Sequence, residues 1–179
     1  MVHEQSSESA RIQDLLRSSK EISDDYENIH FLGEGGMGTV FSGYQKSLGR
    51  KVAIKCILCQ QFADENDVER FKREARVLAR LDHPGIVRLY KIEDKEHLIF
   101  IVFEFIDGET VSARLKKIGT FPIKEAVRLV ARVARVIGFV HNEGIVHRDI
   151  KSENVILLAD GSVKVIDFGL AKDPSGKST

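Results

Sequence analysis

Apolar residues in the first half of the chain follow two different spacings. Most of the segments have the short, β-branched-rich or alternating pattern that is typical of strands. Between residues 64 and 81, however, apolar side chains recur every third or fourth position, as on one face of an amphipathic helix. We therefore expect a β-rich region that contains one helix. The expected strands are residues 26–32, 39–44, 51–58, 86–92 and 98–105.

The second half of the chain has a helical pattern followed by a hairpin pattern. A short helix is predicted at residues 110–118 and a longer one at 124–141, whose apolar residues occupy more than one face. Two apolar runs, 155–158 and 163–166, flank Asp160-Gly161 and predict a β-hairpin. The pattern as a whole is typical of an α+β fold.

Residues 1–24 are rich in Ser, Glu and Gln. Ile12, Leu15 and Leu16 could form one helical stripe, but the composition favours a polar N-terminal arm. The segment has neither a basic start nor an apolar core, so it is not typical of a secretory signal, and we expect a cytoplasmic protein.

Composition narrows the possible partners. The 179 residues are 42% hydrophobic and 30% charged, with a net charge of zero, which gives no general attraction to nucleic acid or anionic membranes. The longest apolar run, 98–103, is too short to span a bilayer. Cys56 and Cys59 lack a second pair of ligands at zinc spacing, and we expect two reduced thiols.

The chemistry-bearing residues concentrate around the predicted hairpin. The sequence His-Arg-Asp-Ile-Lys-Ser-Glu-Asn (147–154) precedes its first strand, and Asp-Phe-Gly (167–169) follows its second. Asn154 and Asp167 should therefore lie at the same open end. Two carboxylates, an ammonium and an amide in one place suit the positioning of a metal-bound phosphate beside a hydroxyl nucleophile.

Two further features belong to the strand-rich region. Residues 33–40 read G-x-G-x-x-G-x-V, a spacing shared with dinucleotide-binding folds, but here the chain continues as strand rather than helix. On the next strand Ala53 and Lys55 share one face. Lys55 on that face and Glu74 beside the apolar stripe of the predicted helix would each need an opposite charge, so we expect them to pair.

In this order, the glycine-rich loop, Val-Ala-Ile-Lys (52–55), the helix glutamate, H-R-D-x-K-x-x-N and D-F-G resemble the eukaryotic-type protein kinase family. The lysine two residues after Asp149, Lys151, resembles the pattern of the serine/threonine branch. The sequence of the glycine-rich loop is similar to that of bacterial members of the family. The resemblance implies a β-rich N-lobe at 25–104, then a hinge and an incomplete helical C-lobe at 105–179.

The resemblance also implies roles: ATP as phosphate donor, Mg²⁺ as cofactor and protein Ser/Thr hydroxyls as acceptors. Asp149 would accept the substrate proton, and His147 would be a packed structural residue. The implied catalytic set is Asp149, Lys151, Lys55 and Glu74. The implied nucleotide-binding set is Leu32, Gly33, Gly35, Gly38, Val40, Ala53, Lys55, Glu104 and Ile106. The implied metal ligands are Asn154 and Asp167.

The family's pattern continues beyond Asp167-Phe168-Gly169 with an activation segment and further helices, which this sequence lacks. Two hypotheses follow: a serine/threonine kinase truncated at its C-terminus, or a non-catalytic ATP-binding or interaction module derived from one. We also expect the helix at 124–141 to stay partly exposed, which favours self-association or a partner through this surface.

Overall fold

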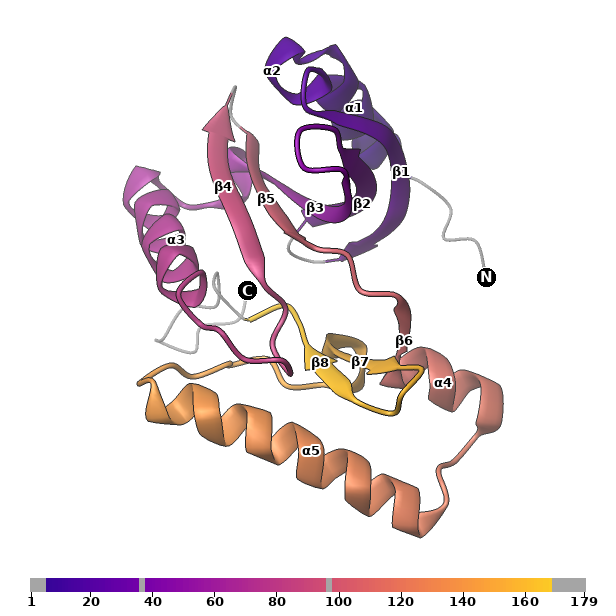
Figure 1. Ribbon diagram of the computed structural model, residues 1–179. Helices are drawn as coiled ribbons and strands as arrows, with labels where there is room; N and C mark the ends of the chain where they lie inside the picture. Colours follow the sequence, from indigo (N-terminus) through magenta and orange to yellow (C-terminus); the bar gives the residue numbers. More distant parts are fainter. Residues whose placement is uncertain (1–5, 36–37, 96–97, 169–179) are drawn as a thin grey trace. The chain divides into compact units, whose positions relative to one another are not determined.

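The structure is a computed structural model that describes residues 6–35, 38–95 and 98–168 (Figure 1). The chain divides into two compact units, one formed by residues 1–79 with 89–105, the other by 80–88 with 106–179. The first unit is built around a β-sheet with helices, and the second combines helices with a smaller sheet. The α+β prediction is confirmed.

The first unit contains a five-stranded antiparallel sheet in the order β1-β2-β3-β5-β4. All five strands were predicted, and β-branched and aromatic residues on one face of the sheet form the core. The strands are β1 (Tyr26–Gly35), β2 (Gly38–Gln45), β3 (Arg50–Leu58), β4 (Leu89–Lys95) and β5 (Leu98–Glu104).

The N-terminal segment is a packed helix, so the prediction of a polar arm was wrong. Helix α1 (Ser7–Ser18) is followed by the single turn α2 (Lys20–Ser23). Ile12 and Leu16 are 2% and 0% exposed. They belong to one core cluster with the residues on the outer face of the sheet, which is the face that carries Phe41 and Ile54. A short apolar stripe cannot make a stable helix in water, and here the sheet supplies the packing that stabilises it.

Helix α3 (Glu65–Leu78) confirms the predicted helix, although it ends three residues earlier than residue 81. Asp64 begins it, because the Asp64 side chain accepts a hydrogen bond from the backbone N–H of Asp67. Phe71 and Ala75 face inward. An ion pair between Lys72 and Asp94 joins α3 to β4, which lies beside it in Figure 1.

The second unit is built on the predicted hairpin. Strands β7 (Val155–Leu158) and β8 (Val163–Val165) pair antiparallel, and an unpredicted short strand, β6 (Gly108–Thr110), adds to β7. Helices α4 (Val111–Ile118) and α5 (Ile123–Asn142) confirm the two predicted helices. Helix α5 runs along this small sheet in Figure 1.

Residues 86–88 do not extend β4, contrary to the prediction of a strand from residue 86. Ile86 instead bridges Val165 in a parallel arrangement, and the N–H of Val87 donates to the carbonyl of Val165 at 3.0 Å. Gly85 permits this path, because a Cβ there would lie 2.4 Å from Cγ2 of Val136 on α5. The prediction that this apolar segment pairs with a strand was right, but the strand is β8 of the hairpin in the second unit.

Helix α5 exposes part of its apolar surface within this chain. Val136 and Val140 are buried, whereas Ile123, Val127 and Val130 are 83%, 63% and 66% exposed. This distribution agrees with the expected partial exposure of the helix. In the part of the chain that the structure describes, α5 and the other helices are not long and apolar enough to cross a membrane.

Candidate functional site

A network of hydrogen bonds in the second unit converges on Asp149. Its Oδ2 accepts from the Nζ of Lys151 at 3.0 Å and from the Nδ2 of Asn154 at 3.0 Å. The same Nδ2 of Asn154 donates to the Asp149 backbone carbonyl at 2.8 Å. Because backbone and carboxylate are held by one buried amide, the orientation of the Asp149 side chain is well defined. This is the arrangement that a general base needs.

Lys151 stays accessible while it pairs with Asp149. Its side chain is 49% exposed, against 15% for that of Asp149. The hydrogen bond to Asp149 raises the pKa of Lys151 above its ordinary value, so the ammonium stays charged. A long, charged and accessible side chain next to a carboxylate can also contact an anionic ligand.

His147 is fully buried and binds the backbone of the loop that carries Asp149. Its Nε2 lies 3.0 Å from the carbonyl oxygen of Ile166, and its Nδ1 accepts the backbone N–H of Asp149 at 3.3 Å. These bonds require the neutral ring with its proton on Nε2. Burial lowers the pKa of His147, which favours the same neutral form. The ring also packs on Phe168, with centroids 4.4 Å apart, as expected for a structural histidine.

The hairpin places Asn154 and Asp167 at its open end. Val155 and Val165 pair in register, and the N–H of Ile166 donates to the carbonyl of Asn154 at 2.9 Å. Asp167 follows directly with a positive φ of 56°. Arg148, which precedes Asp149, also has a positive φ, of 64°. Such backbone conformations in non-glycine residues cost free energy and cluster at functional sites.

The chemistry of Asn154 and Asp167 fits a magnesium ion. Asn154 uses its amide nitrogen on Asp149, which leaves the amide oxygen as its metal-binding atom, and Asp167 adds a carboxylate. Within the described ranges no group of three or more His, Cys, Asp or Glu residues could hold a metal ion. A protein that binds Mg²⁺ through one or two side chains usually relies on phosphate oxygens and water for the other ligands.

Sequence reasoning missed one anchor of this loop. Glu153, which precedes Asn154, accepts from the hydroxyl of Ser112 on α4 at 3.1 Å and from the hydroxyl of Ser152 at 3.1 Å. Thr110 begins α4 by accepting the N–H of Ala113 at 3.0 Å. A serine in the first turn of a helix carries no signal of this contact, because its partner lies 41 residues away in the chain.

In the first unit, three of the predicted nucleotide-binding residues share one face of the sheet. Val40 pairs with Lys55, and Ala53 lies two residues before Lys55 on β3. Their face is opposite to that of Ile54, which is part of the core cluster. Gly33 pairs with Val40 and Gly35 with Gly38 at the glycine-rich turn.

Gly38 is a position where only glycine fits. Its φ is 111°, and a Cβ would lie 2.2 Å from the carbonyl oxygen of Cys56. The other residues predicted to bind nucleotide lie along this sheet and after it. Leu32 is 45% exposed on β1, Glu104 ends β5 opposite Val52, and Ile106 belongs to the second unit.

Lys55 and Glu74 are both half-buried, on β3 and α3 of the first unit. Glu74 directly precedes the buried Ala75, so the side chain of Glu74 leaves α3 next to the apolar face of the helix. The pairing of Lys55 with Glu74 stays a prediction. Gly169, the last residue of the Asp-Phe-Gly motif, lies outside the described residues.

Comparisons with known proteins agree with these observations. Residues 26–179 match the family described as "Protein kinase domain". The chain is 37% identical over 153 residues to serine/threonine-protein kinase PrkC of Bacillus subtilis and 33% identical over 156 residues to PknA of Mycobacterium tuberculosis. These alignments cover 85% and 84% of this chain, but only 24% and 36% of the two relatives.

A solved structure is also similar. The crystal structure of Rad53 residues 1–466 in complex with AMP-PNP matches with a TM-score of 0.73 and 29% sequence identity. The match covers 83% of this chain and 39% of that chain. The chain therefore spans about a quarter to two fifths of the length of these three proteins.

Proposed function

Because this chain belongs to the protein kinase domain family, we propose that it carries the phosphoryl-transfer residues of a serine/threonine protein kinase. The observation that supports this most directly is the network around Asp149, in which Lys151 and Asn154 both bond the carboxylate. ATP would be the phosphate donor and a protein Ser or Thr hydroxyl the acceptor, as in the family.

Each residue of the network has a distinct task in this proposal. Asp149 would accept the proton of the substrate hydroxyl, since its carboxylate is oriented by Asn154 and stays partly accessible. Lys151 would counter the negative charge that develops on the transferred phosphate. Lys55 would contact the ATP phosphates, with Glu74 as its counter-ion. His147 would hold the loop without taking part in proton transfer.

Asn154 and Asp167 would hold Mg²⁺, which neutralises phosphate charge when it is bound. A change in Asp167 should therefore alter the dependence on Mg²⁺, whereas a change in Asn154 should also release the Asp149 carboxylate, to which the Asn154 amide donates. The glycine-rich turn would lie over the phosphates, where the lack of Cβ atoms allows backbone amides to approach.

The test measures ATP binding and turnover separately on the 179-residue chain. Calorimetric titration with ATP, with and without Mg²⁺, is compared for the parent chain, Asp167→Asn and Asp160→Asn. The last variant is a matched control, because Asp160 lies in the hairpin turn, where its carboxylate accepts from the backbone N–H and the hydroxyl of Ser162. We expect Mg²⁺ to strengthen ATP binding to the parent and to Asp160→Asn, and to have little effect on Asp167→Asn.

Transfer of labelled phosphate to a generic protein substrate is then measured for the parent and for Asp149→Asn. Transfer that disappears in Asp149→Asn supports the kinase proposal. ATP binding without transfer by the parent chain supports the alternative, a non-catalytic ATP-binding or interaction module. Equal Mg²⁺ dependence in Asp167→Asn and the parent would contradict the metal role.

A further inference from the structure

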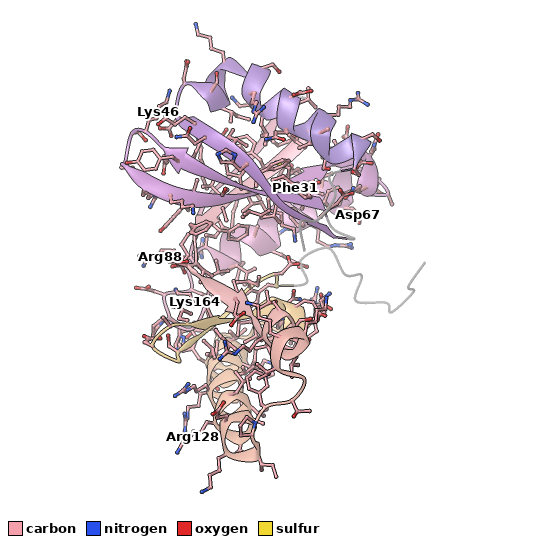
Figure 2. All side chains as sticks on the ribbon, turned by 90° about the vertical axis from the view of Figure 1, so that its right-hand side faces the viewer. Phe31, Lys46, Asp67, Arg88, Arg128 and Lys164 are labelled. Carbon is pink, nitrogen blue, oxygen red and sulfur yellow. The ribbon has the colours of Figure 1, made fainter. Side chains whose placement is uncertain are left out.

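Helix α1 lies outside residues 26–179, which match the kinase family, yet it packs on the hairpin of β1 and β2. Ile12 and Leu16 share a buried cluster with Ile29 of β1 and Phe41 of β2. Phe31, labelled in Figure 2, packs against the same cluster below the helix. Gly33, Gly35 and Gly38 of the glycine-rich segment lie at the end of this hairpin, so α1 contacts the element that is expected to cover the ATP phosphates.

Polar side chains along α1 add directional contacts to this packing. The Nε2 of Gln13 and the Nη2 of Arg17 both donate to the carbonyl oxygen of Ile29, at 2.8 and 3.1 Å. Ile29 lies where the register of β1 and β2 shifts, next to Asn28 with a φ of 53°. The helix thus holds β1 at an irregular point, where the regular ladder is interrupted.

A second register shift decides where Glu34 lies. The shift falls between Phe31 and Gly33, after which Glu34 pairs with Thr39. Thr39 and Phe41 are two residues apart on β2 and therefore share a face, which is the face that packs on α1. Cross-strand partners lie on one face, so Glu34 belongs to the α1 face as well. Val40 belongs to the opposite face.

Ser6 connects the start of α1 to this carboxylate. The hydroxyl of Ser6 donates to Oε2 of Glu34 at 2.7 Å, and Ser6 Oγ accepts the backbone N–H of Ser9 at 3.1 Å. One hydroxyl therefore begins the helix and holds a charged side chain that stands between Gly33 and Gly35. Hydrogen bonds to a carboxylate are stronger than those between neutral groups.

We propose that α1 is a positioning element for the glycine-rich hairpin, in which Ser6 holds the Glu34 carboxylate on the α1 face and thereby raises the affinity for ATP. The proposal rests on the proposed kinase function. If it is released from Ser6, the Glu34 carboxylate can approach the phosphates that the neighbouring glycines are expected to contact, and like charges repel. A hairpin held in place also loses less conformational freedom when nucleotide binds.

The test separates the capping role of Ser6 from its bond to Glu34. Ser6→Asp keeps a good helix-capping side chain but places a second carboxylate against Glu34. Ser7→Asp is the matched control, because it adds the same charge one residue further along α1. The double variant Ser6→Asp with Glu34→Gln restores a hydrogen bond, since the glutamine amide can donate to the new aspartate. The affinity for MgATP is measured by calorimetry for all four chains.

We expect Ser6→Asp to weaken MgATP binding by roughly threefold to tenfold, the net value of one ordinary hydrogen bond, because the bond between Ser6 and Glu34 is exposed to solvent. Ser7→Asp should bind as the parent does, and the double variant should recover most of the loss. Equal affinity in Ser6→Asp and the parent, or an equal loss in Ser7→Asp, would overturn the positioning role. A parent chain that does not bind MgATP would instead contradict the proposed function.

Discussion

Truncating Leu16 to alanine tests whether the N-terminal segment is a structural part of the first unit. The Leu16 side chain is 0% exposed and packs into the core cluster on the outer face of the sheet. Alanine is the best helix former, so Leu16→Ala leaves the propensity of α1 intact or improves it. Any loss of stability therefore reports packing against the sheet alone.

The magnitude follows from what the substitution removes. Three buried carbon groups at about 0.8 kcal/mol each amount to about 2.4 kcal/mol of transfer free energy. The cavity left behind adds to this, and buried Leu→Ala changes typically cost about 2–5 kcal/mol. We expect Leu16→Ala to lower the free energy of unfolding by about 3 kcal/mol, a large fraction of the stability of an ordinary domain.

Urea unfolding followed by circular dichroism provides the measurement, with Leu48→Ala as the control. Leu48 lies in the turn between β2 and β3 and is 62% exposed, so the same chemical change should alter stability by no more than about 0.5 kcal/mol. If residues 1–24 were a polar arm, the two variants would behave alike. A change of less than about 0.5 kcal/mol in Leu16→Ala would therefore refute the packing of α1 on the sheet.

Three further predictions address the site and the second unit. Burial lowers the pKa of His147 below its ordinary value of 6.5, so the unfolded chain binds the proton at a higher pH than the folded chain does. The stability contributed by neutral His147 is therefore present above pH 6.5 and is lost as the pH falls below it. Urea midpoints between pH 8 and pH 5 should therefore fall less steeply in His147→Gln than in the parent. Lys55→Met and Glu74→Gln should each lower the rate of phosphate transfer about a hundredfold or more. The double variant should lower it no further, because paired residues act as a unit. If the losses of the two single variants add up in the double variant in steady-state assays, the pairing is contradicted. Replacing Val127 and Val130, 63% and 66% exposed, by lysine should reduce self-association in analytical ultracentrifugation; a parent chain that stays monomeric at all concentrations would contradict this prediction.

The elements of this protein with strong local patterns could be predicted from sequence. The two apolar runs that flank Asp160-Gly161 predicted the hairpin, and the geometry of any such hairpin places Asn154 and Asp167 at one end. The period of two along β3 likewise placed Ala53 and Lys55 on one face. These inferences succeed because they depend only on residues that are close in the chain.

Contacts between distant segments were decided by the tertiary structure. The stripe of Ile12 and Leu16 was too weak to predict a helix, because the stabilisation comes from an apolar sheet face formed by other strands. An apolar residue at position 86 suits both the predicted extension of β4 and a pairing with β8. Only the edge of β8 in the folded unit determined that Ile86 bridges Val165. One register shift in β1 moved Glu34 to the face of Ser6, since a single extra residue reverses the direction of every following side chain.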